Sequence, residues 1–116
     1  MEVRTDVTDG MAVCRIVGRL DASTGPNLES AVASALGGGN PRILFDMGEV
    51  TFVSSAGLRV ILMAAKQATA AKGGLAIFGL RSAVNEVFEI SGLHKFIPIV
   101  SDETEARSRL AEGSRS

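Results

Sequence analysis

Two adjacent serines, Ser54 and Ser55, are the residues of this 116-residue chain whose type and position best suit a chemical event. They stand where an apolar segment ends and a helical pattern begins. A serine at such a junction often caps the helix, because its hydroxyl accepts a hydrogen bond from an unpaired backbone N–H. A phosphate of about −1.5 to −2 charge is also tolerated at a helix N-terminus. The pair therefore predicts either a helix cap alone or a cap next to a phosphorylation site.

Three nearby residues could take part in contact with a partner. Gly57 lacks a Cβ, so it either lets another protein approach the backbone or packs closely within the fold. Arg59 follows Ser55 by four residues and shares its helix face, where it could attract a carboxylate, pair with an added phosphate or remain a solvated charge. Asp21 lies in a loop expected to flank Ser55, either as a hydrogen-bond partner for another protein or as a turn residue.

The elements that must position these residues follow from the spacing of apolar side chains. Residues 2–8 alternate in the period of a half-buried strand, and Asp9-Gly10 is a hairpin turn signal. Ser23 or Thr24 is expected to cap the first helix, and Ser82 the third. The pattern predicts strands at 2–8, 11–17, 42–47, 75–79 and 96–100, and a turn at 48–49. It also predicts four helices: the first opens at 22–26 and ends at 37–41, the second spans about 55–72, the third runs from 82 to 92, and the fourth begins at 102.

This order of elements predicts an α/β fold with a mixed, mostly parallel sheet of about five strands and about four helices. Strands that alternate with helices are joined by right-handed crossovers and run parallel, whereas the first hairpin is antiparallel. The length allows one domain, residues 1–116, with its folded core at about 3–112 and a flexible tail at 113–116.

Composition excludes several classes of function. The formal net charge is −1, from 12 Lys and Arg against 13 Asp and Glu, which argues against binding to nucleic acid. Cys14 and His94 are the only cysteine and histidine, too few for a zinc site, and Cys14 is expected to be a small buried hydrophobe. No apolar stretch of about 18 residues and no signal peptide is present, so we expect a cytoplasmic protein that does not span a membrane.

An enzyme with a serine nucleophile is the main alternative of another class. It would need His94 as its base, and the chain has neither a G-x-S-x-G elbow nor a Walker or dinucleotide-binding motif. We therefore expect no enzymatic activity, no catalytic residues, no metal and no cofactor. Asp46, at the end of a predicted strand, either acts in a site or is a buried carboxylate that caps a loop amide.

Four stretches in the right order resemble the STAS-domain family, and specifically the bacterial anti-sigma factor antagonists. Together they cover about residues 3–112. They are FDMGEVTFVSSAGLRVILMAAKQA at 45–68, Gly18-Arg19-Leu20-Asp21 followed by Thr24, Gly73-Gly74-Leu75, and VNEVFEISGL at 84–93 followed by Phe96.

The resemblance implies a partner switch. An unphosphorylated antagonist binds an anti-sigma factor, a GHKL-type serine kinase, and so frees a sigma factor for transcription. The kinase uses ATP to phosphorylate the antagonist, which then lets go, and a PP2C-type phosphatase resets it. The family's acceptor falls at Ser55; its preceding Asp is replaced here by Ser54, a lesser alternative acceptor, and Ala56 stands where the family often has Ser.

The resemblance also implies which residues meet the partner. The expected partner-binding set is Asp21, Thr24, Ser54, Ser55, Gly57 and Arg59. The chain is expected to be a monomer or a weak dimer. Stand-alone STAS domains also serve as subunits of lipid transporters or of other kinase–phosphatase signalling complexes, and this alternative stays open.

Overall fold

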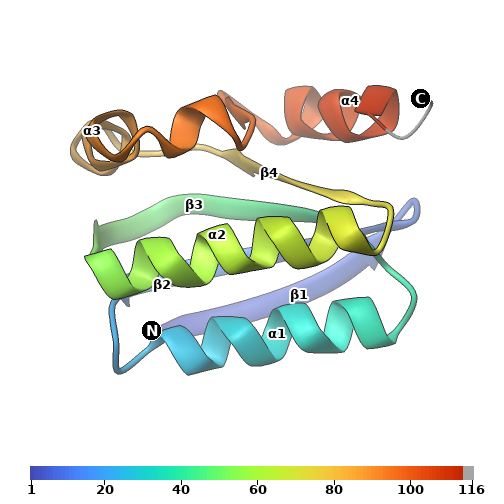
Figure 1. Ribbon diagram of the computed structural model, residues 1–116, viewed down its shortest axis with the longest axis horizontal. Coiled ribbons are helices and arrows are strands. Elements are labelled where there is room, and N and C mark those ends of the chain that lie inside the picture. The colour runs from blue at the N-terminus through green and yellow to red at the C-terminus, as the bar shows by residue number, and fades with distance from the viewer. Residues whose placement is uncertain (114–116) are drawn as a thin grey trace.

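The computed structural model describes residues 1–113, with only the backbone of residues 112 and 113. Of the flexible tail expected at 113–116, residues 114–116 thus lie outside the described residues, and Gly113 ends a helix. The elements in chain order are β1 (Glu2–Thr8), β2 (Met11–Leu20), α1 (Gly25–Gly37), β3 (Arg42–Val53), α2 (Ser55–Ala70), β4 (Gly74–Phe78), α3 (Ser82–Ser91), the 3-10 helix η1 (Leu93–Lys95), β5 (Ile99–Val100) and α4 (Glu103–Gly113) (Figure 1).

Within the described residues the strands form one five-stranded sheet in the order β1-β2-β3-β4-β5. β1 pairs antiparallel with β2, and all the other neighbours are parallel. The hairpin turns at Asp9 and Gly10, whose φ angles of 52° and 75° suit a tight two-residue turn. The predicted α/β fold, with a mostly parallel sheet and an antiparallel first hairpin, is confirmed.

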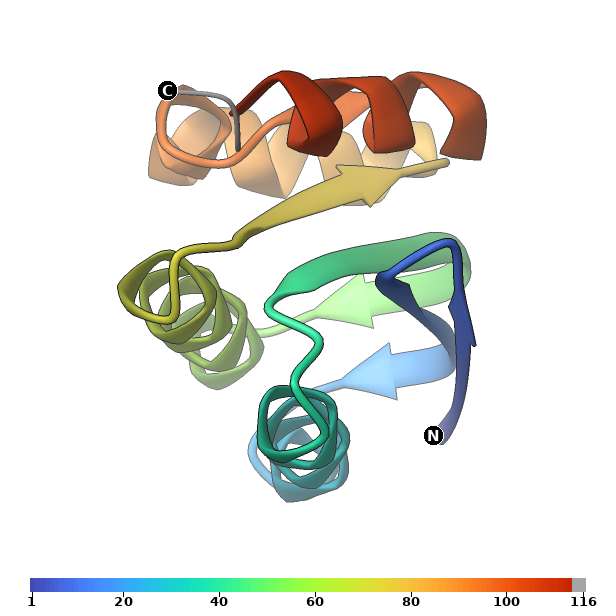
Figure 2. The same cartoon turned by 90° about the vertical axis from the view of Figure 1, so that its right-hand side faces the viewer.

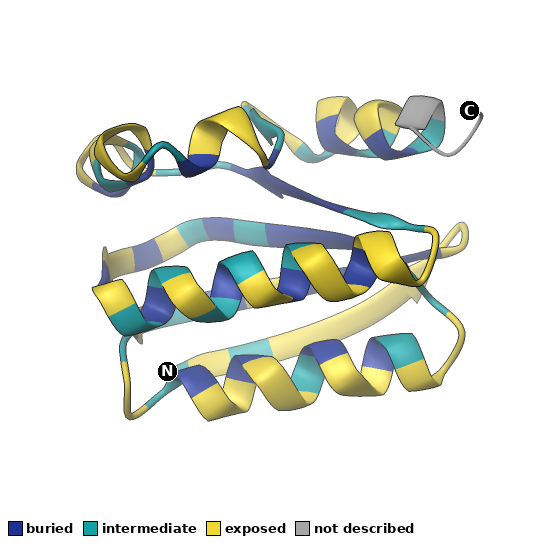
Figure 3. Cartoon of the chain, viewed as in Figure 1, coloured by how far each residue is buried: buried dark blue, intermediate teal, exposed yellow. Residues whose placement is uncertain are grey.

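Helices cover the two faces of the sheet unequally. α1, α2 and α3 contribute to the larger buried cluster on one face, whereas α4 contributes to a smaller cluster on the other. Figure 2 shows α1 and α2 side by side against the strands, and Figure 3 shows β1 as a largely exposed edge strand. Because β2 and β3 are parallel neighbours, the segments that lead from them into α1 and α2 lie at the same edge of the sheet.

The turn predicted at residues 48–49 is wrong, because β3 continues through them to Val53. β2 likewise extends to Leu20 and stays paired with β3 up to Val53. Two register shifts in this ladder absorb the irregularity, and the Gly48 N–H donates a 3.1 Å hydrogen bond to Asp46 Oδ1. The glycine thus lies in an irregular stretch of a continuous strand and does not end it.

Two predicted helix caps are also wrong. Thr24 occupies the N-cap position of α1 without capping it. Its hydroxyl instead accepts from the Asp21 N–H at 2.9 Å and donates to the Arg19 carbonyl at 2.8 Å. Ser82 is the first residue inside α3, after an Arg81 N-cap that makes no side-chain capping bond. The Thr24 hydroxyl, which local sequence rules assign to the cap of α1, is therefore bonded within the loop that precedes this helix.

The last predicted strand is shorter than expected. Phe96 is 78% exposed and follows η1, and only Ile99 and Val100 pair with β4. Pro98 limits this strand because it has no N–H to donate to the ladder. α2 ends at Ala70, before the predicted position 72.

Cys14 is fully buried, as predicted. Burial raises the pKa of its thiol, and the Thr5 hydroxyl contacts its Sγ at 3.6 Å. Within residues 1–113, no helix has the length and apolar character needed to cross a membrane.

Candidate functional site

Ser54 fastens the start of α2 to the end of β2. Its Oγ accepts a 3.2 Å hydrogen bond from the Gly57 N–H, and its carbonyl accepts one of 2.9 Å from the Leu58 N–H. Its own N–H donates to the Leu20 carbonyl at 2.9 Å. Ser54 is therefore the helix cap that the serine pair predicted.

Ser55 is the first residue of α2 and is exposed. Its hydroxyl makes no hydrogen bond within the described part of the chain. The two serines thus differ in role, since one hydroxyl holds the helix and the other is free. A phosphate on Ser55 Oγ would break no existing side-chain bond, and it would stand near the unpaired N–H groups of the first turn.

Gly57 is buried and faces the end of β2. A Cβ at this position would lie 2.6 Å from the Leu20 carbonyl oxygen and 3.0 Å from Leu20 Cγ. Contacts that short are not tolerated, so only glycine lets α2 begin this close to the strand. Of its two predicted roles, close packing is present; contact with a partner's backbone stays a prediction.

The loop between β2 and α1 is organised around Asp21. Its Oδ1 accepts from the Ser23 hydroxyl at 2.7 Å, the Ser23 N–H at 3.0 Å and the Thr24 N–H at 3.2 Å. These bonds, led by that from the Ser23 hydroxyl, lower the pKa of Asp21. The loop adjoins the serine pair, as expected, through the bond from Ser54 to Leu20. Asp21 acts here as a turn residue, and its contact with a partner remains a prediction.

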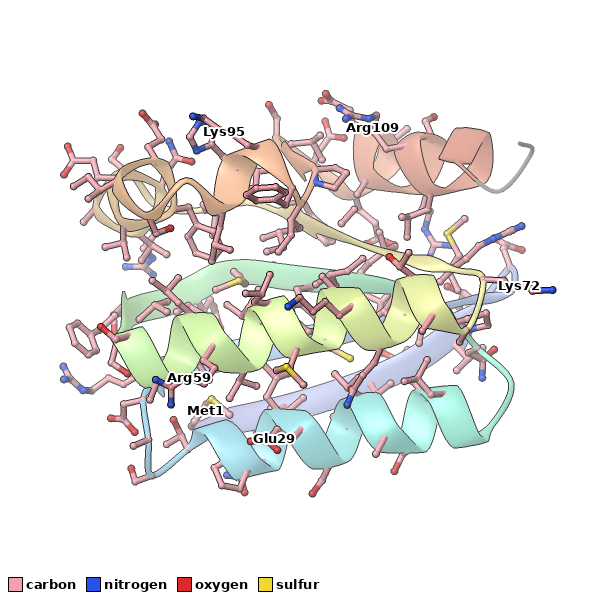
Figure 4. All side chains as sticks on the ribbon, viewed as in Figure 1. Met1, Glu29, Arg59, Lys72, Lys95 and Arg109 are labelled. Atoms are coloured by element: carbon pink, nitrogen blue, oxygen red, sulfur yellow. The ribbon has the colours of Figure 1, made fainter. Side chains whose placement is uncertain are left out.

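Arg59 lies one helical turn after Ser55, is exposed, and forms no ion pair within residues 1–113. Figure 4 shows Arg59 on α2, on the side of that helix toward α1, which carries Glu29. Both residues line a groove of about 600 Å³ between the two helices, whose lining includes the apolar side chains of Val60 and Met63. Arg59 is therefore a cation at the wall of this groove, one helical turn from Ser55, with no ion-pair partner among the described residues.

Sequence reasoning missed the pairing of Arg19 with Phe52. The guanidinium carbon of Arg19 lies 4.2 Å from the centroid of the Phe52 ring. The two residues are cross-strand neighbours in the β2–β3 ladder. Each stands out in the sequence only as a charged or aromatic residue near the end of an apolar segment. Their juxtaposition depends on a ladder with two register shifts, which no local pattern reveals.

The residues needed for a serine nucleophile are not assembled. His94 is exposed in η1, where its Nδ1 lies 3.3 Å from the carbonyl oxygen of Phe88 in α3. No hydrogen bond connects it to Ser54 or Ser55 within the described residues. Across that same part of the chain, no group of three or more His, Cys, Asp or Glu side chains could hold a metal ion.

Asp46 belongs to a surface charge network. It accepts a 2.8 Å bond from Arg15, which also contacts Glu103 at 3.4 Å, and Glu103 pairs with Arg107 at 2.9 Å. The predicted amide cap exists as its bond from Gly48, but Asp46 is half-buried within β3 and is not in a loop. The network joins α4 to the sheet, so its role is structural.

Comparisons with known proteins agree with this fold. The family model described as the STAS domain matches residues 2–106. BtrV of Bordetella bronchiseptica, named as an anti-sigma factor antagonist, is 35% identical over 106 residues, which span 91% of each chain. A solved structure from Thermotoga maritima, described as an anti-sigma factor antagonist, superposes with a TM-score of 0.87 at 18% identity and covers 94% of both chains.

The Bacillus cell fate determinant SpoIIAA, solved in its phosphorylated form, has a TM-score of 0.71 at 23% identity. The match covers 93% of this chain and 98% of SpoIIAA. At these identities the solved structures establish the fold, whereas the family model and BtrV establish descent. Together with the five-stranded sheet and the serine-capped α2, they show that the chain belongs to the STAS domain family, in which its relative BtrV is named as an anti-sigma factor antagonist.

Proposed function

We propose that this chain is an anti-sigma factor antagonist whose binding is switched by phosphorylation of Ser55. In its unphosphorylated form it binds a GHKL-type anti-sigma factor kinase and thereby frees a sigma factor for transcription. The kinase phosphorylates Ser55 and the complex separates, and a PP2C-type phosphatase restores the first state. The chain has no catalytic role in this cycle, because the kinase and the phosphatase carry out the chemistry.

The observation that carries this proposal is the exposed, unbonded hydroxyl of Ser55 beside the bonded hydroxyl of Ser54. Phosphoryl transfer forms a bond from Ser55 Oγ to the γ-phosphorus of ATP, releases ADP and passes the hydroxyl proton to a base of the kinase. A phosphate on Ser54 would instead disturb the cap on Gly57, so Ser55 is the better acceptor. The phosphorylated form of SpoIIAA supports the proposal, since it is an example of a protein of this fold that has been solved with a phosphorylated residue.

The deciding experiment captures partners on the immobilised chain with ATP, with ADP and without nucleotide. We expect a GHKL-type kinase to be retained without nucleotide or with ADP and to be lost with ATP as the chain becomes phosphorylated. Recovery of a transporter ATPase without such a kinase would instead assign the chain to the transporter-subunit role.

Phosphopeptide mass spectrometry then locates the label. We expect it on Ser55 in the parent chain and in the Ser54→Ala variant, and we expect none in Ser55→Ala, which still binds the kinase. Label found at neither serine would contradict the assigned site.

A further inference from the structure

Arg19 and Phe52 form an exposed cation–π pair near the serines. The ring of Phe52 is 40% exposed, with the Arg19 guanidinium carbon 4.2 Å from its centroid. Within the described residues, the Arg19 side chain makes no hydrogen bond or ion pair. Its N–H donors are therefore held in a defined place and remain free for a ligand.

The pair stands near the end of the β2–β3 ladder, a few residues before Ser55 at the start of α2. Arg19 and Phe52 are neighbours in the ladder, and the next registered pair is Leu20 and Val53, which are both buried. Because successive side chains along a strand point to opposite faces of the sheet, Arg19 and Phe52 project from the face opposite to that of Leu20 and Val53, at the end of the ladder. Phe52 precedes Ser55 by three residues, so their Cα atoms are at most about 11 Å apart.

The chemistry of the pair fits one kind of contact. Three of the five phenylalanines, Phe45, Phe78 and Phe88, are buried, so an exposed ring here adds apolar surface that the core does not use. Arginine and aromatic residues are enriched at the energetic centres of protein interfaces. A guanidinium held on a ring offers a planar fork that matches a carboxylate and costs little ordering entropy on binding.

We propose that Arg19, held on Phe52, receives an acidic side chain of the kinase that docks at Ser55. The contact rests on the proposed function, because it assumes that this kinase is the partner. Arg19 would add attraction to the approach, and Phe52 would fix the guanidinium and cover the aliphatic part of the acidic side chain. The two residues thus help the partner select this chain, while Ser55 carries the switch.

The test measures association and dissociation of the kinase captured as above, at low and at physiological salt. Arg19→Gln is expected to slow association at low salt by roughly fivefold and to flatten its salt dependence, because one steering charge is lost. Phe52→Leu is expected to speed dissociation, and the double variant to lose less than the two single losses combined, since both act through one contact. Arg109→Gln, which removes an exposed arginine of α4 (labelled in Figure 4), is the matched control and should bind as the parent does.

The outcomes separate the two proposals. If Arg19→Gln binds the kinase as Arg109→Gln does, and Ser55 is still phosphorylated, the docking contact is overturned and the proposed function is left intact. A parent chain that binds no such kinase overturns both. Arg19→Lys covers the case in which Arg19→Gln fails to fold. It is expected to keep the salt dependence and to dissociate faster, and unchanged dissociation would contradict the stacked geometry.

Discussion

The N–H of Ser54 donates a 2.9 Å hydrogen bond to the carbonyl of Leu20, so the first turn of α2 is fixed directly to the end of β2. The same Leu20 carbonyl oxygen is the atom that a Cβ on Gly57 would meet at 2.6 Å. One backbone carbonyl therefore both holds the helix and sets how closely it can approach. The position of Ser55 at the surface depends on this arrangement, so we expect its perturbation to change both the stability of the chain and its binding to the proposed kinase.

Gly57→Ala tests the close approach. The added methyl cannot fit without a shift of α2 away from Leu20, and we expect the free energy of unfolding to fall by about 1–3 kcal/mol. Urea denaturation measures this loss. Gly37→Ala is the matched control, since in the described residues the Cβ that it would add to α1 meets nothing within 4 Å apart from its chain neighbours and the backbone of its own helix. That control should be neutral or slightly stabilising, and equal losses in the two variants would contradict the steric role of Gly57.

Ser54→Ala tests the division of roles between the two serines. Loss of the cap on Gly57 is expected to cost about 1 kcal/mol of stability in urea denaturation. Ser55→Ala, which removes a hydroxyl that bonds nothing in the described residues, should change stability by less than about 0.5 kcal/mol. Ser54→Asp restores an accepting oxygen at the cap and should recover most of the loss. If Ser55→Ala were the more costly change, the assignment of the cap would be wrong.

The serine pair could be predicted from the sequence because a helix cap is a local device. Its rule needs only the residue type and the start of an apolar helical period, and both lie within a few positions of Ser54. The fold class was predictable for a similar reason, since strand and helix periods and the Asp9-Gly10 turn are local signals.

What the sequence could not reveal depends on contacts between distant segments. The pairing of Arg19 with Phe52 requires the β2–β3 register with its two shifts, and the continuation of β3 through Gly48 requires the same ladder. The Thr24 hydroxyl does not cap α1, because it forms hydrogen bonds with the backbone of Asp21 and Arg19 in the loop before this helix. In each case a tertiary or loop interaction overrides the local rule.

Asp21 predicts a dependence of stability on acid. Its pKa is lowered in the folded state by bonds from Ser23 and Thr24, so the folded chain favours the ionised carboxylate. The resulting stabilisation is present above the unfolded pKa of about 4 and is lost as pH falls through the lower folded value. Urea denaturation between pH 7 and pH 3 should therefore show less acid destabilisation in Asp21→Asn than in the parent.

Asp6→Asn is the control for that series, because Asp6 is an exposed carboxylate of β1 with no side-chain hydrogen bond in the described residues. It removes a carboxylate of the same type without removing a side-chain hydrogen bond of the described residues, so it measures the effect of losing one charge alone. If Asp21→Asn followed the pH dependence of the parent, folding would not favour the ionised form of Asp21, and the lowered pKa of this carboxylate in the folded state would be contradicted.

Ser55→Asp should separate binding from folding. A negative charge at the first residue of α2 interacts favourably with the helix dipole, so we expect stability to be unchanged or to rise by about 0.3–1 kcal/mol. The same charge, set against the kinase surface that accommodates a neutral hydroxyl, should weaken binding at least several-fold. Ser108→Asp adds one charge to an exposed position of α4, on the other face of the sheet, and should leave binding unaltered. Equal weakening in both variants would show that net charge, and not its place beside Ser54, controls the complex. Loss of folded structure in Ser55→Asp would instead mean that the first turn of α2 cannot carry the modification.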